Sequence, residues 1–329
     1  MSWLVWRQYR ASTAITGVLI GLFAVLLVIT GLAMARQFHA DFGACLAANT
    51  CRFPNSASLG SGLVGAMVEF SLAVPALLGM FLGGPAVARE VETGTAHFAW
   101  TQAVTRRHWL TVKTGWLLLA AVAWGGAVGA LVTWWSGPRN TVALNQFNPG
   151  TFDVQGIMPA AYSLFAMALG IAAGTLIRRV LPALGVTLGV FFAVRLMIMG
   201  WVRQHYMTPV TSTYNITANL LPPKGAAWIL GQGIRGPNGP LTLSGGPAQI
   251  VGNGFPVADI PAACHAYFSQ GSASRQLFSC LTSHGYSQYI TYQPAARYWP
   301  FQFIEAGIFV ALAAALIAVA FAVINRRDA

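Results

Sequence analysis

Six long apolar runs constrain the fold of this chain more than any other feature of its sequence. They cover residues 12–35, 60–87, 114–135, 158–177, 180–202 and 301–324. A helix of about 20 residues crosses a bilayer core, so each run is long enough to span a membrane. Only 8% of the residues are charged, against about 25% in soluble globular proteins. The sequence therefore predicts an all-α polytopic membrane protein with six transmembrane helices.

The basic residues favour an orientation with both termini in the cytoplasm, because Lys and Arg are enriched at cytoplasmic span ends. The two short outer loops then hold only Arg36, Arg52 and Arg139. The long outer segment 203–300 is discounted, since long loops cross regardless of their charge. The cytoplasmic set is larger and comprises Arg7, Arg10, Arg89, Arg106, Arg107, Lys113, Arg178, Arg179, Arg326 and Arg327. These short clusters account for the net charge of +11 without nucleic acid as a partner.

Residues 1–11 are predicted to form a cytoplasmic amphipathic helix. Trp3 and Trp6 beside Arg7 suit a helix in the headgroup layer, although a frayed terminus fits equally well. No cleavable signal peptide is expected, because the first apolar run is too long and no small-residue cleavage pattern follows it. Residues 12–202 then carry helices one to five, and residues 301–329 carry helix six with a cytoplasmic tail.

The outer segment 203–300 is predicted to be an extracellular cap. Prolines between Pro222 and Pro261 exclude long helices there, so a short helix is expected only at residues 265–281. Cys264 and Cys280 fall in this cap, and Cys45 and Cys51 fall in the first outer loop. Four cysteines in an oxidising compartment predict two disulfides, most simply Cys45–Cys51 and Cys264–Cys280. Pairing between the two loops stays open.

A zinc site is the alternative use of the cysteines in the cap. It would combine Cys264, His265, Cys280 and His284. Their spacing matches no usual zinc pattern, so no metal is expected.

Three ionisable residues lie inside the predicted spans: Glu69, Arg195 and Glu305. A charge at the bilayer centre costs about 2.5–3.5 kcal/mol on insertion scales, so such residues should face protein or water and pair. All three fall in the outer halves of their spans, and Arg195 is predicted to pair with Glu69 or Glu305. The cluster is interpreted either as a gate or substrate contact beneath the cap, or as a bridge that holds spans together.

Motifs that would indicate an enzyme are absent from the sequence. No stretch fits the phosphate-binding pattern of a glycine loop followed by Lys and Ser or Thr. No His lies inside a predicted span, so neither a serine nor a zinc membrane protease has a candidate site. No catalytic residue is predicted. No strong inverted repeat is visible, which disfavours a secondary transporter.

A charged segment at residues 88–113 separates the second and third runs. Arg89, Glu90 and Glu92 open it, and Gly94 followed by Thr95 ends one helix and caps the next. A short helix is expected at about residues 96–104, lying along the membrane surface and offered to a cytoplasmic partner. An ordinary charged loop is the alternative.

This segment resembles type-2 ABC export permeases of the actinobacterial kind. The resemblance rests on Arg89-Glu90-Val91-Glu92-Thr93-Gly94-Thr95 and on Ala99-Trp100-Thr101-Gln102-Ala103-Val104-Thr105-Arg106. Trp109-Leu110 continues the match, and further matches are Trp3 with Trp6-Arg7-Gln8-Tyr9-Arg10, Gly156-Ile157-Met158-Pro159 with Ala161-Tyr162, and Arg178-Arg179 with Pro182-Ala183. It covers most of the first 200 residues and does not extend to the cap.

The resemblance implies a permease subunit of a bacterial cell membrane. A separate ABC ATPase subunit would bind ATP and Mg, so this chain would need no cofactor of its own. Two permease copies, identical or related, would form the path for a drug, antibiotic, peptide or lipid. The residues expected to couple the permease to the ATPase are Arg89, Glu90, Glu92, Gly94, Thr95, Trp100, Arg106 and Arg107. The alternative is a membrane-anchored sensor that binds a ligand through its cap.

Overall fold

The computed structural model describes residues 2–47, 61–93, 106–140, 147–216, 226–237, 239–240, 261–267 and 275–327. The chain divides into two compact units. The helical unit comprises Met1–Ala143, Asn148–Arg203 and Trp299–Ala329. The sheet unit comprises Leu144–Phe147 and Gln204–Tyr298.

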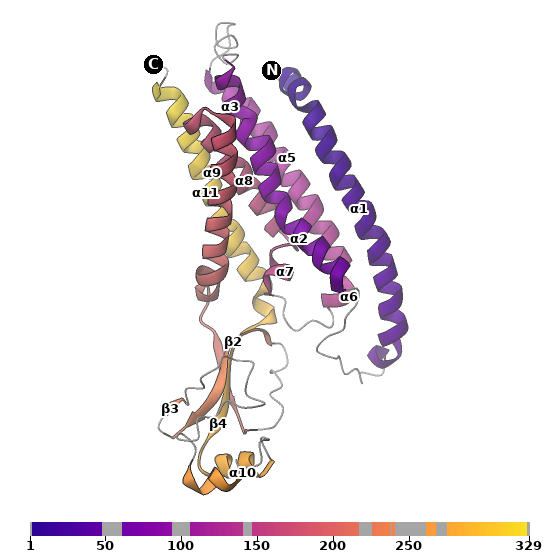
Figure 1. Ribbon diagram of the computed structural model, residues 1–329, viewed down its shortest axis with the longest axis vertical. Coiled ribbons are helices and arrows are strands. Elements are labelled where there is room, and N and C mark those ends of the chain that lie inside the picture. The colour runs from indigo at the N-terminus through magenta and orange to yellow at the C-terminus, as the bar shows by residue number, and fades with distance from the viewer. Residues whose placement is uncertain are drawn as a thin grey trace. The chain divides into compact units, whose positions relative to one another are not determined.

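Six helices of the described chain are long and apolar enough to cross a membrane, which confirms the predicted number of spans. Two of them contain a π-turn, in which one extra residue is accommodated within a helical turn. Figure 1 shows the helices that form the spans. They are α1 (Ser2–Ala47), α2 (Ser61–Leu78) with η1 (Gly79–Gly83) and α3 (Gly84–Glu92), α5 (Arg106–Trp135), α8 (Met158–Ile177), α9 (Val180–Met197) with η2 (Ile198–Val202) and η3 (Arg203–His205), and α11 (Tyr298–Arg327). Helix α1 is continuous, so residues 2–11 extend the first span without a break.

Helix α8 is the central helix of the helical unit. Buried residues make up 78% of its most apolar window, against 22–39% in the other five spans. The α2–η1–α3 span packs against it at glycines, because larger side chains would separate the two backbones. A Cβ added to Gly83 would lie 2.8 Å from the Met167 carbonyl oxygen, and one added to Gly174 would lie 2.5 Å from that of Gly84. Small residues thus allow close packing here without a hydrophobic driving force.

Two short helices, α6 (Gly137–Asn140) and α7 (Pro149–Phe152), follow α5. Asn148 caps α7, since its Oδ1 accepts a hydrogen bond from the Gly150 amide at 3.1 Å. The chain after α7 stays buried through Gln155 before α8 begins. A polar turn is therefore enclosed within the helical unit next to the start of the central helix.

The sheet unit contains a four-stranded antiparallel sheet that the sequence analysis did not predict. Its strand order is β1 (Val210–Tyr214), β4 (Ser287–Pro294), β2 (Ala226–Gly236) and β3 (Gly239–Pro240). The predicted short helix corresponds to η5 (Ala262–Tyr267) and α10 (Arg275–Ser283), and η6 (Ala295–Arg297) closes the unit. Its small apolar core comprises Ile216, Ile234, Cys264, Leu277, Phe278 and Leu281. The predicted all-α fold therefore holds for the six spans, but the segment between the last two spans contains both helices and strands.

Candidate functional site

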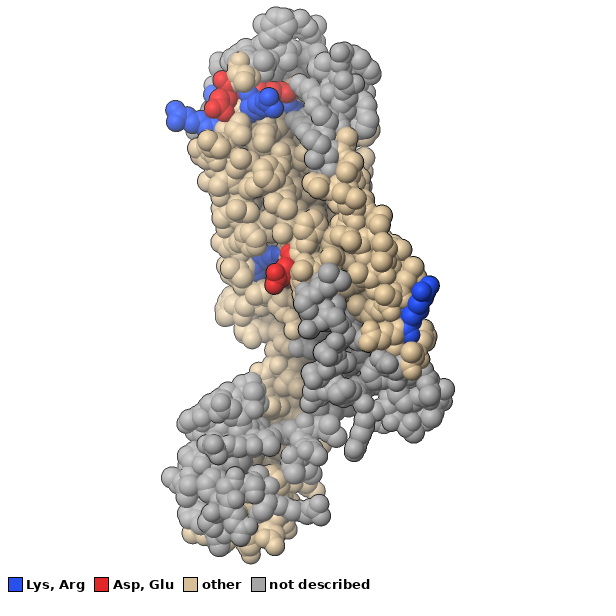
Figure 2. Space-filling view, turned by 45° about the vertical axis from the view of Figure 1, so that its right-hand side comes forward, with Lys and Arg blue, Asp and Glu red and all other residues tan. Residues whose placement is uncertain are grey.

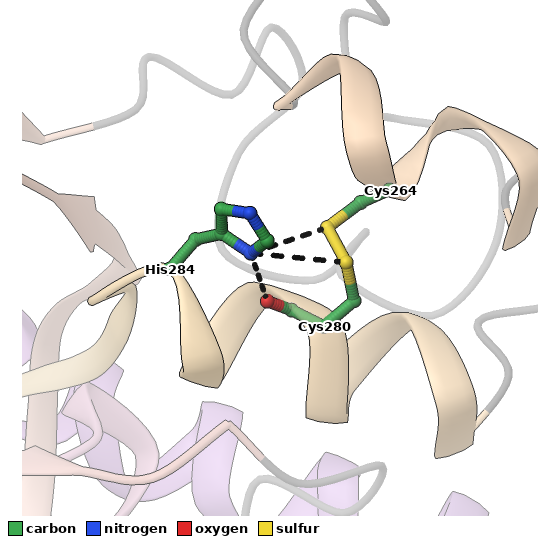
Figure 3. A group of neighbouring side chains, drawn as sticks. All are labelled: Cys264, Cys280 and His284. Carbon is green, nitrogen blue, oxygen red and sulfur yellow. Dashed lines mark hydrogen bonds between the residues drawn. A yellow bond between two sulfur atoms is a disulfide. The ribbon is translucent and has the colours of Figure 1, made fainter.

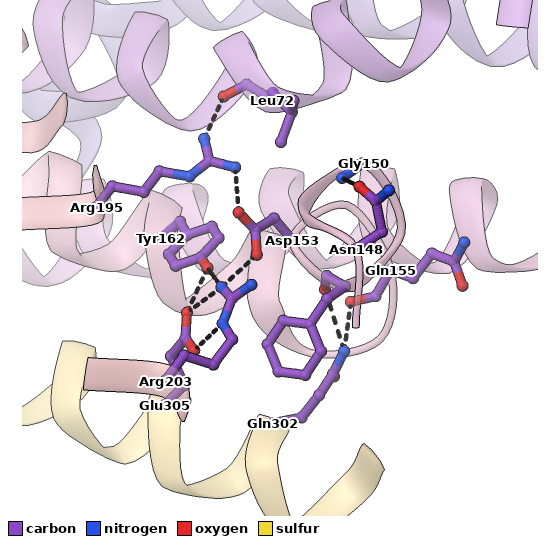
Figure 4. A network of polar contacts seen from close by, with 11 residues as sticks. Leu72, Asn148, Gly150, Asp153, Gln155, Tyr162, Arg195, Arg203, Gln302 and Glu305 are labelled. Carbon is purple, nitrogen blue, oxygen red and sulfur yellow. Dashed lines mark hydrogen bonds and ion pairs between the residues drawn. The ribbon is translucent and has the colours of Figure 1, made fainter. Parts of the chain in front are cut away.

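A network of buried charged side chains lies inside the helical unit (Figure 4). Arg195 comes from α9, Arg203 from the start of η3, and Glu305 from α11. Asp153 follows α7 directly, and Tyr162 belongs to α8. All five side chains are buried. Segments that are far apart in the sequence thus meet at one polar centre.

The two arginines and two carboxylates compensate each other. Asp153 bridges them, with Oδ2 at 2.9 Å from Arg195 Nη2 and Oδ1 at 2.5 Å from Arg203 Nη2. Arg203 also donates to both oxygens of Glu305, from Nε at 2.8 Å and from Nη2 at 2.7 Å. Such a forked arginine–carboxylate contact is directional and strong. Two positive and two negative groups leave no net charge at the centre.

Neutral groups complete the network. The Tyr162 hydroxyl donates to Glu305 Oε1 at 2.7 Å, and the Arg195 guanidinium donates to the Leu72 carbonyl of α2 at 3.0 Å. The guanidinium of Arg203 also lies over the Phe152 ring, 4.3 Å from its centre. Because buried charges are tolerated only when their hydrogen-bonding capacity is used, these contacts account for their presence at this depth.

Gln302 of α11 holds the turn that presents Asp153. Its Nε2 donates to the carbonyls of Phe152 and Gln155 at 3.3 and 3.2 Å, and its Oε1 accepts from the Ile157 amide at 3.0 Å. Gly156 in this turn has a φ of +63°, a conformation that side chains with a Cβ rarely adopt. One amide side chain therefore satisfies three backbone groups that would otherwise be buried without partners.

The structure corrects the predicted pairing of Arg195. Its ion pair is with Asp153, not with Glu69 or Glu305. Glu305 belongs to the same network but pairs with Arg203, and Glu69 is exposed on α2. Asp153 was missed because it precedes the fourth apolar run, and Arg203 because it follows the fifth. The π-turn is the physical reason for the position of Arg203. In a regular α-helix, Arg203 would lie about 80° around the helix axis from Arg195. The extra residue of the π-turn reduces this angle to about 20°, so the two side chains share one face of the helix.

A second polar centre lies where the predicted coupling segment begins and ends. Glu90 Oε1 of α3 lies 2.5 Å from Lys113 Nζ of α5, and the Lys113 side chain is buried. The ammonium also lies 4.9 Å from the centre of the Trp109 ring. This pair joins the helix that enters the segment to the helix that leaves it. Charged side chains gather at the end of the helical unit drawn at the top of Figure 2.

Glu92 connects the same end of α3 to α9. Its Oε2 accepts a hydrogen bond from the Val180 amide at 3.1 Å, at the first residue of α9. Arg178 ends α8 in a left-handed conformation, with φ of 58°, and Arg179 provides no side-chain cap for α9. A carboxylate near a helix N-terminus satisfies a free amide and is favoured by the helix dipole. Helix α3, at the end of the second span, thus caps α9.

The other residues predicted to couple the chain to a partner are only partly described. Arg89 is exposed at the end of α3. Arg106 and Arg107 form the first residues of α5, and their side chains are outside the described part. Gly94, Thr95, Trp100 and the expected helix at residues 96–104 lie outside the described residues, so their predicted structure stays a prediction.

The family model described as ABC-2 membrane transporter related matches residues 17–203. The chain belongs to this family. No curated protein and no solved structure matches it. The ABC-2-related region contains four of the six spans and nearly all of the fifth, and it ends at Arg203, directly before the main segment of the sheet unit. Membership makes the chain a multi-pass membrane transport subunit of a type that associates in general with an ABC ATPase.

In the sheet unit of this ABC-2-related protein, Cys264 and Cys280 form a disulfide that joins η5 to α10. Both sulfurs lie near His284, which follows α10 (Figure 3). The expected Cys45–Cys51 disulfide falls outside the part of the chain whose side chains are described.

Proposed function

We propose that this chain is the permease subunit of an ATP-driven exporter. It would move an amphipathic or hydrophobic substrate outward across the cell membrane, with a separate ATPase subunit binding ATP and Mg. Both termini and the segment 88–113 would face the cytoplasm, and residues 203–300 would form the extracellular cap. Two copies, identical or related, would form the translocation path. The family match over residues 17–203 carries this proposal.

The contacts of Glu90 and Glu92 support a route for force through the helical unit. A partner that displaces the segment 88–113 would move α5 through the Glu90–Lys113 pair and α9 through the Glu92–Val180 contact. Helix α9 and its extensions run from Val180 to Arg203, which corresponds to roughly 35 Å at 1.5 Å per residue. Motion at one end of this stiff element would therefore reach the buried charge network at the other.

At the far end of α9, the network is suited to act as an outer gate. Asp153, Arg195, Arg203 and Glu305 hold the turn after α7 against α9 and α11. Separation of these groups would admit water to the outer half of the path. The same contacts also support the structural interpretation, in which they only hold the spans together.

Reconstitution with a candidate ATPase tests the proposal. The ATPase should co-purify with the wild-type chain, and the permease should stimulate ATP hydrolysis. Glu92→Ala combined with Thr95→Ala should reduce this stimulation while the chain stays folded. Glu69→Ala, at an exposed glutamate on a different part of the second span, serves as the matched control. Failure of any phosphate-loop ATPase to associate with the chain would contradict the proposal.

The sensor alternative is supported by one observation, the separate core and sheet of residues 204–298. Such a sensor would bind its ligand through this unit and would be stable and active without an ATPase. Ligand binding that persists in cells lacking every associated ATPase, together with no measurable transport, would favour it over the exporter.

A further inference from the structure

Three side chains that commonly bind metal ions converge in the sheet unit (Figure 3). His284 Nδ1 lies 4.0 Å from Cys264 Sγ and 3.9 Å from Cys280 Sγ. All three ligand atoms lie within 4.8 Å of one another. In the present state the two sulfurs are bonded to each other, so neither is a thiolate.

Secondary structure holds the three groups in place. Cys280 and His284 are four residues apart, and the His284 amide donates to the Cys280 carbonyl at 3.2 Å, so they share one face of α10 and its last turn. Cys264 lies on η5 and is fully buried in the core of the unit, beside Leu277 and Leu281. The convergence therefore does not depend on the disulfide alone.

We propose that reduction of the Cys264–Cys280 disulfide converts this group into a zinc site. The ligands would be the two thiolates and His284 Nδ1, with water in the fourth position. An external dithiol would supply two electrons and two protons, break the sulfur–sulfur bond and leave as its own cyclic disulfide. Zinc would then displace the two thiol protons. The site is distinct from the proposed transport function and does not depend on it.

The geometry suits zinc after a small adjustment. Zinc–sulfur bonds of about 2.3 Å and zinc–nitrogen bonds of about 2.0 Å place a sulfur and a nitrogen about 3.5 Å apart in a tetrahedral site, and two sulfurs about 3.8 Å apart. The sulfur–nitrogen distances of 4.0 and 3.9 Å would each have to shorten by about 0.5 Å to reach this value. The two sulfurs also have to move apart, which reduction itself allows. The spacing of these residues in the sequence matches no usual zinc pattern, because η5 and α10 together, and no single local motif, bring the ligands to one place.

His284 would exchange one contact for another. Its Nδ1 now lies 2.8 Å from the Cys280 carbonyl oxygen, which only accepts hydrogen bonds, so Nδ1 carries the proton. When Nδ1 binds zinc, the neutral imidazole carries its proton on Nε2 instead. His284 is exposed, so Nε2 can donate to water. The metal would then hold η5 to α10 in the reduced state, as the disulfide does in the oxidised state.

The test measures zinc binding by the full-length chain in detergent. Cys45→Ser and Cys51→Ser remove the other two thiols, and Zn²⁺ alone is the probe, in competition with a chromogenic chelator. We expect one zinc per chain after treatment with a dithiol and its removal, and none before treatment. Co²⁺ in place of Zn²⁺ should give the absorption bands of tetrahedral thiolate coordination.

Two variants separate this site from a simple dithiol. His284→Ala keeps both thiols but removes a direct ligand, so it should weaken zinc binding by at least about 100-fold, the upper end of the effect of losing a group that only supports a ligand. His205→Ala, at an exposed histidine of the same unit, should leave the affinity unchanged. Equal affinities of the His284→Ala and unmodified chains, or no zinc bound after reduction, would overturn the proposal. If the chain with Cys45→Ser and Cys51→Ser does not fold, the zinc affinity of His284→Ala is compared with that of the wild-type chain, both with Cys45 and Cys51 intact.

Discussion

Arg203 illustrates how a single buried charge is accommodated in this protein. Its guanidinium contacts Asp153 and Glu305, and it lies over the Phe152 ring. The two carboxylates compensate its charge, and Arg195 balances the second negative charge. Each group therefore depends on the others, so removal of one leaves a buried charge without full compensation.

Arg203→Met should destabilise the chain by about 3–5 kcal/mol, the usual cost of breaking a buried ion pair by removing one partner. Thermal unfolding of the detergent-solubilised protein measures this change. Arg36→Met, at an exposed arginine of α1, is the matched control and should change stability by no more than about 0.5 kcal/mol. An unfolding midpoint that is the same for Arg203→Met and the wild type would contradict the network.

Asp153→Asn and Arg195→Ala should each destabilise the chain, but the double variant should cost less than their sum. The two residues share one ion pair, so each single variant removes the same contact. An interaction free energy of about 0.5–3 kcal/mol is expected from a double-mutant cycle. Strict additivity would contradict the pair. If Arg195→Ala changed neither stability nor transport, both the gate and the structural interpretation would be wrong.

At the scale of elements, packing against the central helix α8 and the side-chain cap at the start of α9 decide how the spans fit together. Helix α8 packs backbone to backbone with the α2–η1–α3 span at Gly170 and Gly174. Helix α9 begins with an amide that Glu92 of α3 satisfies. Both contacts connect the predicted coupling segment to the interior of the helical unit. The first is close backbone packing at glycines, and the second is a hydrogen bond from a helix N-terminus to a carboxylate.

Gly170→Ala should destabilise the helical unit by about 1–3 kcal/mol, the range for overpacking a close contact. An added Cβ at Gly170 would lie 2.7 Å from the Gly84 amide nitrogen, so the two spans would have to separate. Gly115→Ala is the control, because an added Cβ there meets nothing within 4 Å. Equal unfolding midpoints for the two variants would mean that α8 does not pack as closely as described.

Glu92→Ala should destabilise α9 by about 1 kcal/mol, a typical value for the loss of an N-terminal cap. Glu92→Gln keeps an oxygen that can accept from the Val180 amide, so it should lose less. Hydrogen exchange of the first amides of α9 provides the measurement, with protection falling in Glu92→Ala. A larger loss in Glu92→Gln than in Glu92→Ala would rule out the cap.

At the scale of the whole molecule, the match to the ABC-2-related family ends at the boundary between the two units. The helical unit and the sheet unit are thus two distinct compact parts of one chain. A unit with its own disulfide and core, placed between two spans, is compatible with an extracellular position.

Labelling of intact cells tests the orientation. A membrane-impermeant thiol reagent should modify Ser212→Cys in the sheet unit and should not modify Arg326→Cys near the C-terminus. Permeabilised cells should show modification of both, which controls for the accessibility of each thiol. Modification of Arg326→Cys in intact cells, with Ser212→Cys protected, would invert the proposed layout.

Much of this architecture could be predicted from local patterns. Apolar length specifies the six spans, because a helix must cross a bilayer core of known thickness. The charged motif around Glu90 and Glu92 indicates the family, since its residues lie together in the sequence. The polar network could be predicted only in part. Arg195 and Glu305 are conspicuous inside apolar runs, whereas Asp153 and Arg203 lie beyond the run ends and look like ordinary loop residues.

The sequence by itself determined that this is a six-span membrane protein of the ABC-2 type and that its charges are confined to a few places. Only the tertiary structure decided which of these charges meet. A turn held by Gln302 carries Asp153 inward, and a π-turn rotates Arg203 toward Glu305. The same holds for Cys264, Cys280 and His284, which η5 and α10 bring together. Local sequence patterns indicate whether a segment will be buried in a membrane or exposed to water. Which side chains contact each other depends on the packing of segments that are distant along the chain.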